Sequence, residues 1–234
     1  MEKMGNFNKQ PSNIQKQIIV YIHAYFMYNI SMAVKDKTSS IQKIRDILRD
    51  QNGILFTADL EKHNIPRTYL SFLEKNGEIE RISRGVYTAT NMMVDEMVSL
   101  QARYKGAIFS HETALYLLEL TDRSPLYYSV TVPSRYNATS LKTSGAKVYF
   151  VNRDLYPLGL ITMKSPQGND IKTFNLERTI CDVLRSRNQM DIQFISEALK
   201  KYVIHKDRNI DRLVRYAMQF RIQKKVREYI EVLL

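Results

Sequence analysis

The sequence predicts an α+β fold, in which a small helical unit ending in a β-hairpin precedes a mixed α/β unit with a small sheet and a helical C-terminal tail. Residues 39–90 hold three short amphipathic segments and then an alternating one. Residues 126–174 are rich in the β-branched and aromatic residues that favour strands. Residues 191–234 return to helical spacing. We therefore expect domains at 39–90 and 91–234, after an N-terminal extension at 1–38.

The composition favours a partner with negative charge. The 234 residues include 35 Lys and Arg against 24 Asp and Glu, which gives a formal net charge of +11. Such a balance favours nucleic acid as the partner, although a generic basic cytosolic protein has the same charge. Cys181 is the only cysteine, which excludes an internal disulfide and a cysteine-based zinc site. The histidines are not at metal-ligand spacing, so we expect no metal and no cofactor.

The N-terminal extension contains an apolar, aromatic stretch at residues 18–34. It resembles a weak signal peptide or membrane segment. It is short for a bilayer span, which needs roughly 20 apolar residues, and no small-residue cleavage site follows. We favour a helix that packs on the body of the protein or on a second copy. A third interpretation is that Met32 is the natural start and that the preceding residues are non-native upstream sequence. We expect a cytoplasmic protein without a membrane partner.

The first two helices follow a polar linker at residues 35–40. Ser39 or Ser40 is the expected N-cap of the first helix, which ends at Gly53. Its apolar residues at positions 41, 44, 47 and 48 fall on one face. Thr57 is the expected N-cap of the second helix, whose first turn carries the acidic residues that a helix dipole favours.

The third helix and the hairpin complete this unit. Pro66 fits the first helical position, and Gly77 fits the C-terminal stop. Leu70 and Leu73 would face inward. Residues 79–87 then alternate around a turn at 83–85, where Gly85 can adopt the positive φ that a tight turn demands. Three short helices followed by a hairpin predict a winged helix-turn-helix.

A winged helix-turn-helix places its third helix in the major groove of DNA and its hairpin, the wing, near a neighbouring groove or the phosphates. Arginine and threonine early in that helix suit base edges, whereas a late lysine suits phosphate. The expected DNA-binding residues are Arg67, Thr68, Tyr69, Ser71, Lys75, Arg81 and Arg84. The alternative is a small domain that only packs against another protein.

The second unit is expected to mix helices and strands. Its first helix would start near Asn91 and turn four residues inward, Met93, Met97, Leu100 and Tyr104. Ser110 is expected to cap the next helix and Asn175 a later one. Strands are expected at residues 126–133, 146–152, 158–164 and 170–175. The chain is expected to end in three helices at residues 191–203, 209–220 and 223–234.

A second basic patch is expected on the terminal helices. Ten basic residues lie between positions 200 and 227, opposed only by Asp207 and Asp211. The centre of this patch would comprise Lys200, Lys201, Arg208, Arg212 and Arg215. A solvated helical face, a second contact with the DNA backbone and a docking face for an acidic partner all explain these charges.

An enzymatic alternative starts from Asp170 and Lys172, which have the acid-x-lysine spacing of many metal-dependent nucleases. A carboxylate cluster for Mg²⁺ would be completed by Asp154, Glu177 and Asp182. A bare acid-x-lysine pair is a weak signal without a second motif. Glu177 is more simply a helix-start acid, and Asp182 lies four residues after Arg178, at the spacing of a helical ion pair. We therefore expect no catalytic residues.

Several segments resemble a known family. Residues 59–87, DLEKHNIPRTYLSFLEKNGEIERISRGVY, are similar to the N-terminal winged helix of the AbiEi antitoxins. The segments FSHETALYLLELTD, VTVP and NLERTICDVL resemble the C-terminal domain of the same family and follow in the same order. The most specific parts are RISRGVY and ERTICD. The resemblance runs over roughly residues 40–234 and leaves the N-terminal extension outside.

The resemblance implies the antitoxin of a type IV toxin–antitoxin system that acts in abortive infection against phage. In this family the N-terminal domain represses the shared operon by binding inverted repeats in the promoter. The C-terminal domain, here from Asn91 onward, counters a nucleotidyltransferase-like toxin without forming a stable complex with it. The expected partners are therefore double-stranded operator DNA and such a toxin, and the expected function is not enzymatic.

Overall fold

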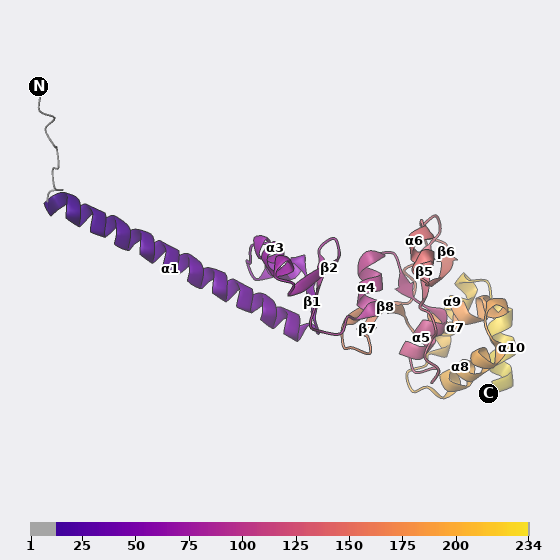
Figure 1. The fold of residues 1–234 in the computed structure, drawn as a ribbon. Helices are drawn as coiled ribbons and strands as arrows, with labels where there is room; N and C mark the ends of the chain where they lie inside the picture. The colour runs from indigo at the N-terminus through magenta and orange to yellow at the C-terminus, as the bar shows by residue number, and fades with distance from the viewer. Residues whose placement is uncertain (1–12, 234) are drawn as a thin grey trace, which may run out of the picture.

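The computed structural model describes residues 13–233 and has a mixed α/β architecture with two small sheets (Figure 1). The first elements in chain order are α1 (Asn13–Asp50), β1 (Ile54–Phe56), α2 (Thr57–Lys62), α3 (Thr68–Lys75), β2 (Ile79–Ser83) and β3 (Val86–Ala89). They are followed by α4 (Glu96–Arg103), β4 (Ile108–Phe109), α5 (His111–Leu117), β5 (Ser129–Pro133), α6 (Thr139–Thr143), β6 (Lys147–Val151), β7 (Leu160–Lys164) and β8 (Asp170–Phe174). The last elements are α7 (Leu176–Arg185), the 3₁₀ turn η1 (Arg187–Gln189), α8 (Ile192–Ile204), α9 (Ile210–Gln219) and α10 (Gln223–Leu233).

The first sheet has the strand order β1-β3-β2 and is antiparallel throughout. Strands β2 and β3 form the predicted hairpin, and Gly85 in its turn has a φ of +81°. Helices α2 and α3 and the C-terminal part of α1 share one apolar core with this sheet. The predicted inward residues Leu70 and Leu73 are both buried in that core, which confirms the orientation of α3.

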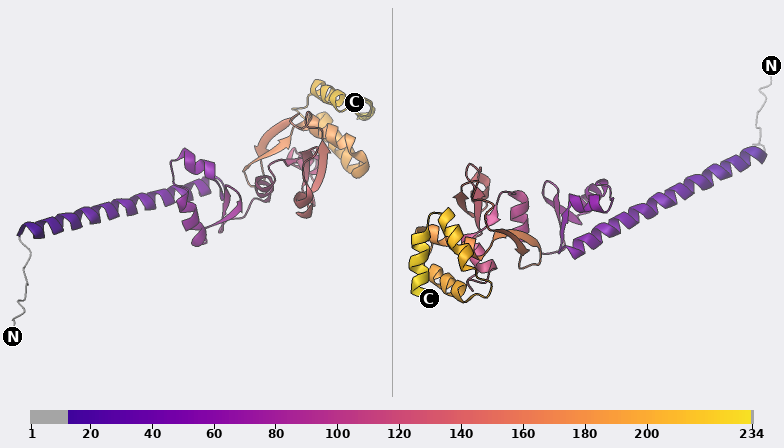
Figure 2. Two further views of the ribbon diagram at one scale, coloured as in Figure 1. Left: turned by 90° about the horizontal axis from the view of Figure 1, so that it is seen from above. Right: turned by 180° about the vertical axis from the view of Figure 1, so that it is seen from behind.

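The second sheet has the strand order β6-β5-β4-β8-β7. The pairs β5–β6 and β4–β8 are parallel, whereas β4–β5 and β7–β8 are antiparallel. Helix α7 packs against α5, α8 and α9, and every residue from Leu176 to Leu184 is buried. Figure 2 shows α8, α9 and α10 gathered at the end of the molecule opposite to the start of α1.

Helix α4 connects the two sheets because it packs against both β2 and β8. Ser83 at the end of β2 donates its hydroxyl to the carbonyl oxygen of Ala102 at 3.1 Å. The helix starts at Glu96, later than predicted, and Met93 lies outside it with 85% of its surface exposed. The hairpin therefore contacts the second half of the chain through α4.

The late start of α4 follows from Asp95, which is fully buried and caps the helix. One oxygen of its carboxylate accepts from the backbone N–H groups of Met97 at 3.0 Å and Val98 at 3.2 Å. The other oxygen accepts from the Ser165 hydroxyl and from Asn169 Nδ2, in the turn between β7 and β8. A single carboxylate therefore joins the helix start to the second sheet.

Helix α1 differs most from its prediction. It runs without a break for 38 residues, so residues 35–40 are helical and neither Ser39 nor Ser40 is an N-cap. Neither proline nor glycine occurs between Asn13 and Asp50, so nothing in this polar stretch stops a helix from propagating. The expectation that the extension packs on the body is also wrong, because its N-terminal part projects into solvent (Figures 1 and 2). Tyr21 is 73% exposed there.

No helix among residues 13–233 combines the length and the apolar character that crossing a membrane requires. Residues 1–12, the start of the predicted extension, lie outside the described part of the chain. Packing of α1 on a second copy stays a prediction.

Two further helix starts shift by one or two residues. Thr57 is the first residue of α2 and not its cap, because the N-cap Phe56 donates its backbone N–H to Asp59 Oδ2 at 3.2 Å. Helix α3 starts at Thr68, because Pro66 lies in a tighter turn, where its carbonyl oxygen accepts from the N–H of the third residue on.

Candidate nucleic-acid interface

Helix α3 presents a polar face to solvent beside the hairpin. Thr68, Ser71 and Lys75 are exposed on this face, whereas Leu70 and Leu73 are buried beneath it. Steps of three and four residues keep the polar side chains on one side of a helix with 3.6 residues per turn. Because α3 contacts β2, this face and the hairpin belong to one surface (Figure 1).

Arg67 is the N-cap residue of α3 and forms an ion pair with Glu61 near the end of α2. The two side chains are 64% and 59% exposed. Exposed pairs of this kind contribute about 0–1 kcal/mol. Arg67 must leave Glu61 to reach a base or a phosphate, and this exchange of one anionic or polar partner for another costs little.

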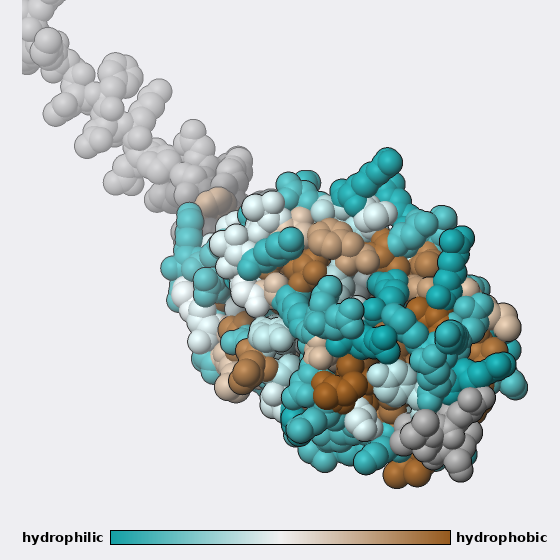
Figure 3. All heavy atoms as spheres, turned by 90° about the vertical axis from the view of Figure 1, so that its right-hand side faces the viewer, coloured by the Kyte–Doolittle hydropathy of each residue, from teal (hydrophilic) through white to brown (hydrophobic). Residues whose placement is uncertain are grey.

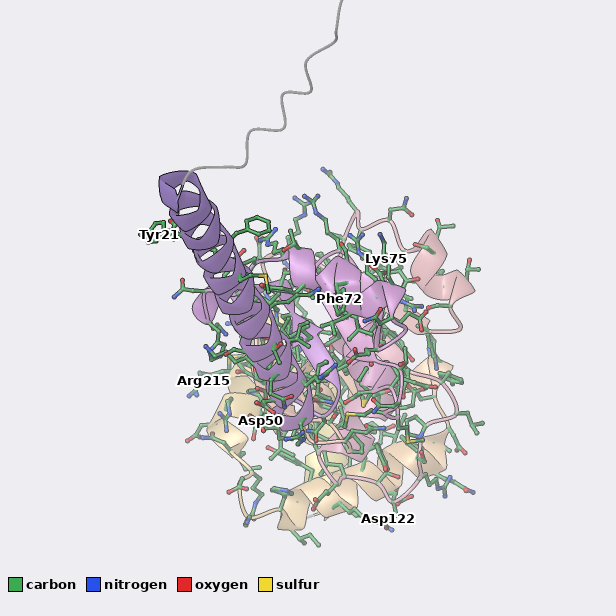
Figure 4. All side chains as sticks on the ribbon, turned by 60° about the vertical axis from the view of Figure 1, so that its left-hand side comes forward. Tyr21, Asp50, Phe72, Lys75, Asp122 and Arg215 are labelled. Carbon is green, nitrogen blue, oxygen red and sulfur yellow. The ribbon has the colours of Figure 1, made fainter. Side chains whose placement is uncertain are left out.

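The margins of α3 are formed by Tyr69 and Phe72, which are half-buried against the first core. The Nζ atom of Lys37 on α1 lies 4.2 Å from the centre of the Phe72 ring, within the range of a cation–π contact. Figure 4 labels Phe72 and Lys75 on α3. Lys37 was missed from the sequence. It is exposed and lies one helical turn before Ile41, but the expected linker at 35–40 concealed that α1 runs through this position.

The hairpin carries the two predicted arginines. Arg84 is exposed at the turn, and Arg81 on β2 donates Nε–H to the carbonyl oxygen of Ser83 at 3.3 Å. The carbonyl oxygen of Gly85 accepts from the N–H of Thr57 at 2.9 Å, which ties the turn to the start of α2. A Cβ atom on Gly85 would lie 2.9 Å from Thr57 Oγ1, so both φ and space require glycine there.

Two members of the second predicted basic patch form ion pairs. Lys201 pairs with Asp122 at 2.7 Å, and Arg212 pairs with the buried Glu177 at 2.8 Å. The exposed members are Lys200, Arg208 and Arg215. Figure 4 shows Arg215 and Asp122 on separate parts of the surface. A contact between this patch and DNA stays a prediction.

The carboxylates of the enzymatic alternative do not converge. Asp170 pairs with Lys164 across β7 and β8 at 2.8 Å, and both side chains are 66% exposed. Asp154 is exposed, whereas Glu177 and Asp182 are buried and each is held by an arginine. In residues 13–233, no group of three or more Asp, Glu, His or Cys side chains is placed to hold a metal ion. The nuclease alternative therefore lacks the cluster on which it depends.

The ERTICD segment contains the predicted pair of Arg178 with Asp182, and it is fully buried. Arg178 Nε donates to Asp182 Oδ2 at 2.9 Å, and Nη1 donates to the carbonyl oxygens of Leu155 and Leu158, each at 2.7 Å. Burial lowers the pKa of Arg178 and raises the pKa of Asp182. Asn175 caps this helix as predicted, since its Oδ1 accepts from the Arg178 N–H at 3.0 Å. The pair fastens α7 to the loop before β7.

A buried polar cluster around His111 was also missed from the sequence. The ring nitrogens Nδ1 and Nε2 lie 3.0 Å and 3.1 Å from the hydroxyls of Ser110 and Ser186, and the ring stacks on Tyr149 at 3.4 Å. Burial, and then the nearby Arg185, lower the pKa of His111 well below its ordinary value. Ser110 is the predicted N-cap residue, but its side chain bonds to this cluster and not to the helix end. Ser110 and His111 are buried, whereas Ser186 is half-buried at the edge of the cluster.

Comparisons with known proteins agree with this geometry. Residues 42–90 match the family described as "Transcriptional regulator, AbiEi antitoxin". The crystal structure of RV2827C protein from Mycobacterium tuberculosis has a similar fold, with a TM-score of 0.52 and 14% identity over 80% of this chain and 77% of that chain. A comparison with curated proteins gave no match. The matched residues include α2, α3 and the hairpin, the elements that carried the resemblance in sequence. Residues 42–90 are thus similar to the AbiEi antitoxin family of transcriptional regulators.

Proposed function

We propose that this chain represses its own operon by binding inverted repeats in the promoter through a winged helix-turn-helix at residues 39–90. We further propose that residues 91–234 counter a nucleotidyltransferase-like toxin of a type IV abortive-infection system. The observation that carries the first function is the exposed polar face of α3 beside a hairpin with an arginine at its turn. The family match of residues 42–90 and the sequence resemblance of the second half support the antitoxin function.

In the proposed complex, α3 enters the major groove and the hairpin acts as the wing. Thr68 and Ser71 are short, exposed and early in α3, which suits contacts with base edges. Lys75, one helical turn after Ser71, suits a phosphate, and Arg84 at the turn suits a phosphate or the neighbouring groove. Arg67 reads a base after it exchanges Glu61 for the DNA.

The first experiment is a gel-shift titration of the full chain on its own promoter and on scrambled DNA, at two salt concentrations. We expect tighter binding to the promoter, and a steep fall of affinity on both DNAs as salt increases, because phosphate contacts release counterions. Equal binding to both DNAs, or no binding, would contradict the repressor function and favour a domain that contacts another protein.

Substitutions on α3 separate base reading from backbone contacts. Arg67→Ala should weaken promoter binding by about 1–3 kcal/mol and leave binding to scrambled DNA nearly unchanged. Lys75→Ala should weaken binding to both DNAs and reduce the salt slope by about 1. Lys142→Ala, an exposed lysine on α6, is the matched control and should change neither. If Arg67→Ala weakens both DNAs equally, Arg67 contacts phosphate and not a base.

The antitoxin function is tested separately, by growth of cells that express the neighbouring toxin together with this chain. The intact chain should restore growth, and Lys75→Ala should restore it equally, because the proposed antitoxin region lies outside α3. Purification through a tag on the chain should retain no toxin if the system is of type IV. Failure of the intact chain to restore growth would contradict the antitoxin function and leave repression untouched.

A further inference from the structure

Helix α9 exposes three large apolar side chains in a row. Ile210, Val214 and Met218 are 38%, 41% and 55% exposed, and their four-residue spacing places them along one line of the helix. The core does not require this line, because Leu213 and Ala217 already anchor α9 with 1% exposure each. A helix face that only meets water is normally polar, so a second apolar line indicates a contact surface.

This apolar line forms one wall of a groove. Helix α10 packs against α9, and a cavity of about 460 Å³ lies between the two helices. Val226 and Gln223 contribute to the lining from α10, and the charged lining residues are Lys224 and Arg227. Figure 3 shows the end of the molecule that holds α8, α9 and α10, where apolar patches lie among long hydrophilic side chains. The groove is thus apolar along its length and basic at its rim.

The surroundings of the groove are strongly basic. Positions 200–233 contain ten Lys and Arg against two Asp and two Glu, and two of the basic residues, Lys201 and Arg212, are in the ion pairs described above. Arg215 follows Val214 directly, and Arg221 lies in the turn between α9 and α10; both are exposed. Charges at the rim of an interface steer association toward a partner of opposite sign. The groove therefore favours a partner whose flanks are acidic.

We propose that the groove between α9 and α10 binds an amphipathic α-helix of a partner protein, with apolar residues facing the groove and Asp or Glu along both flanks. The line from Ile210 to Met218 spans about 12 Å at 1.5 Å per residue, which is the length of two turns of a docked helix. DNA satisfies mainly the charges, because its sugar–phosphate backbone offers little apolar surface to pack on Met218. The basic residues around α9 thus serve a protein partner.

The test uses the full chain and two labelled synthetic helical peptides of 18 residues. Both carry leucine at positions spaced by three and four residues, and one has glutamate on its flanks where the other has lysine. Fluorescence anisotropy should show binding of the glutamate peptide at least tenfold tighter than that of the lysine peptide. If both bind alike, or the glutamate peptide does not bind, the proposal is overturned.

Substitutions locate the binding. Val214→Ser combined with Met218→Ser should weaken binding of the glutamate peptide at least tenfold. Both side chains are partly exposed, so the fold should persist, and circular dichroism checks this. Ile204→Ser is the matched control, because Ile204 is 80% exposed on α8 and does not line the groove. Equal loss in the control, or no loss in the double variant, would show that the peptide binds elsewhere and overturn the proposal.

An anionic membrane also combines apolar and acidic character, so vesicles form a further arm of the test. The chain should not sediment with vesicles of three parts phosphatidylcholine and one part phosphatidylserine. Sedimentation that the double variant abolishes would assign the groove to a membrane surface and overturn the proposal. The double variant should bind the promoter in gel shifts as tightly as the intact chain. Failure of the groove proposal can therefore be distinguished from failure of the repressor function.

Discussion

The buried ion pair of Arg178 and Asp182 allows a sharp prediction about stability. Asp182→Ala removes the carboxylate and leaves the Arg178 guanidinium enclosed, with no exposure of its side chain. That guanidinium contacts the rings of Phe174 and Phe220, with its carbon 4.1 Å and 4.6 Å from their centres. Water therefore cannot replace the lost partner without disrupting the core.

The size of the loss follows from this burial. Breaking a buried pair by removing one partner destabilises proteins by about 3–5 kcal/mol, because an uncompensated charge remains. For a chain of this length, each kcal/mol lowers the unfolding midpoint by about 2–4 °C, so the expected decrease is roughly 6–20 °C. Asp170→Ala is the matched control, because its pair with Lys164 is 66% exposed on both sides and should contribute only about 0–1 kcal/mol.

Thermal unfolding followed by circular dichroism measures both variants. Asp182→Asn distinguishes charge from packing, because asparagine nearly keeps the shape of aspartate and removes its charge. If the uncompensated guanidinium causes the loss of stability, Asp182→Asn should lower the unfolding midpoint nearly as much as Asp182→Ala does. A decrease for Asp182→Ala as small as that for Asp170→Ala would refute the reasoning. A large decrease for alanine with almost none for asparagine would assign the loss to the cavity.

Three further predictions concern buried or constrained positions. Burial lowers the folded-state pKa of His111, so its contribution to the free energy of unfolding should be complete above the unfolded pKa of about 6.5. Below that pH the free energy of unfolding should decrease by at most about 1.4 kcal/mol per pH unit. Urea midpoints of His111→Gln should therefore depend less on pH than those of the intact chain. Gly159→Ala would place a Cβ 2.6 Å from Arg178 Cβ at a φ of +73°, and it should lower the free energy of unfolding by roughly 2–5 kcal/mol. Gly145→Ala is the control, because its Cβ would meet nothing within 4 Å, and thermal unfolding should show the smaller loss there. Asp95→Ala should lose more than the roughly 0.5–2 kcal/mol of a helix cap, because buried donors are also left unpaired, and an ordinary capping loss in urea unfolding would contradict this.

The parts of the fold that the sequence predicts are those with local signals. The hairpin follows from an alternating pattern with a glycine that only a turn explains, and Gly85 indeed has positive φ. The start of α7 follows from Asn175, whose side chain caps the helix. In both cases the decisive contacts lie within a few residues of chain, so the pattern and the structure report the same interactions.

The parts that differ depend on competition or on distant contacts. The polar stretch at residues 35–40 has the composition of a linker but contains no helix breaker, so the helix continues through it. Asp95 competes with Asn91 for the start of α4 and prevails because Ser165 and Asn169, distant in sequence, complete its hydrogen bonds. Periodicity alone could not distinguish these starts.

In the candidate interface, too, local features are predictable from the sequence, whereas contacts between distant segments are not. The exposed positions on α3 follow from helical spacing, since burying Leu70 and Leu73 leaves Thr68, Ser71 and Lys75 outside. The partner of Arg67 and the position of Lys37 over Phe72 depend on how α2 and α1 pack, and no local pattern contains that information.

The enclosed position of Cys181 has a practical consequence for labelling. Burial raises the pKa of its thiol to about 12, and the thiolate is the form that reacts with maleimides. The native cysteine should therefore stay inert in the folded protein, and it is the only cysteine in the chain. Ser71→Cys on α3, or Val214→Cys on α9, would then accept a fluorophore or spin label at one site. Distances from α3 and from the groove can thus be followed in solution with the interior of α7 left intact.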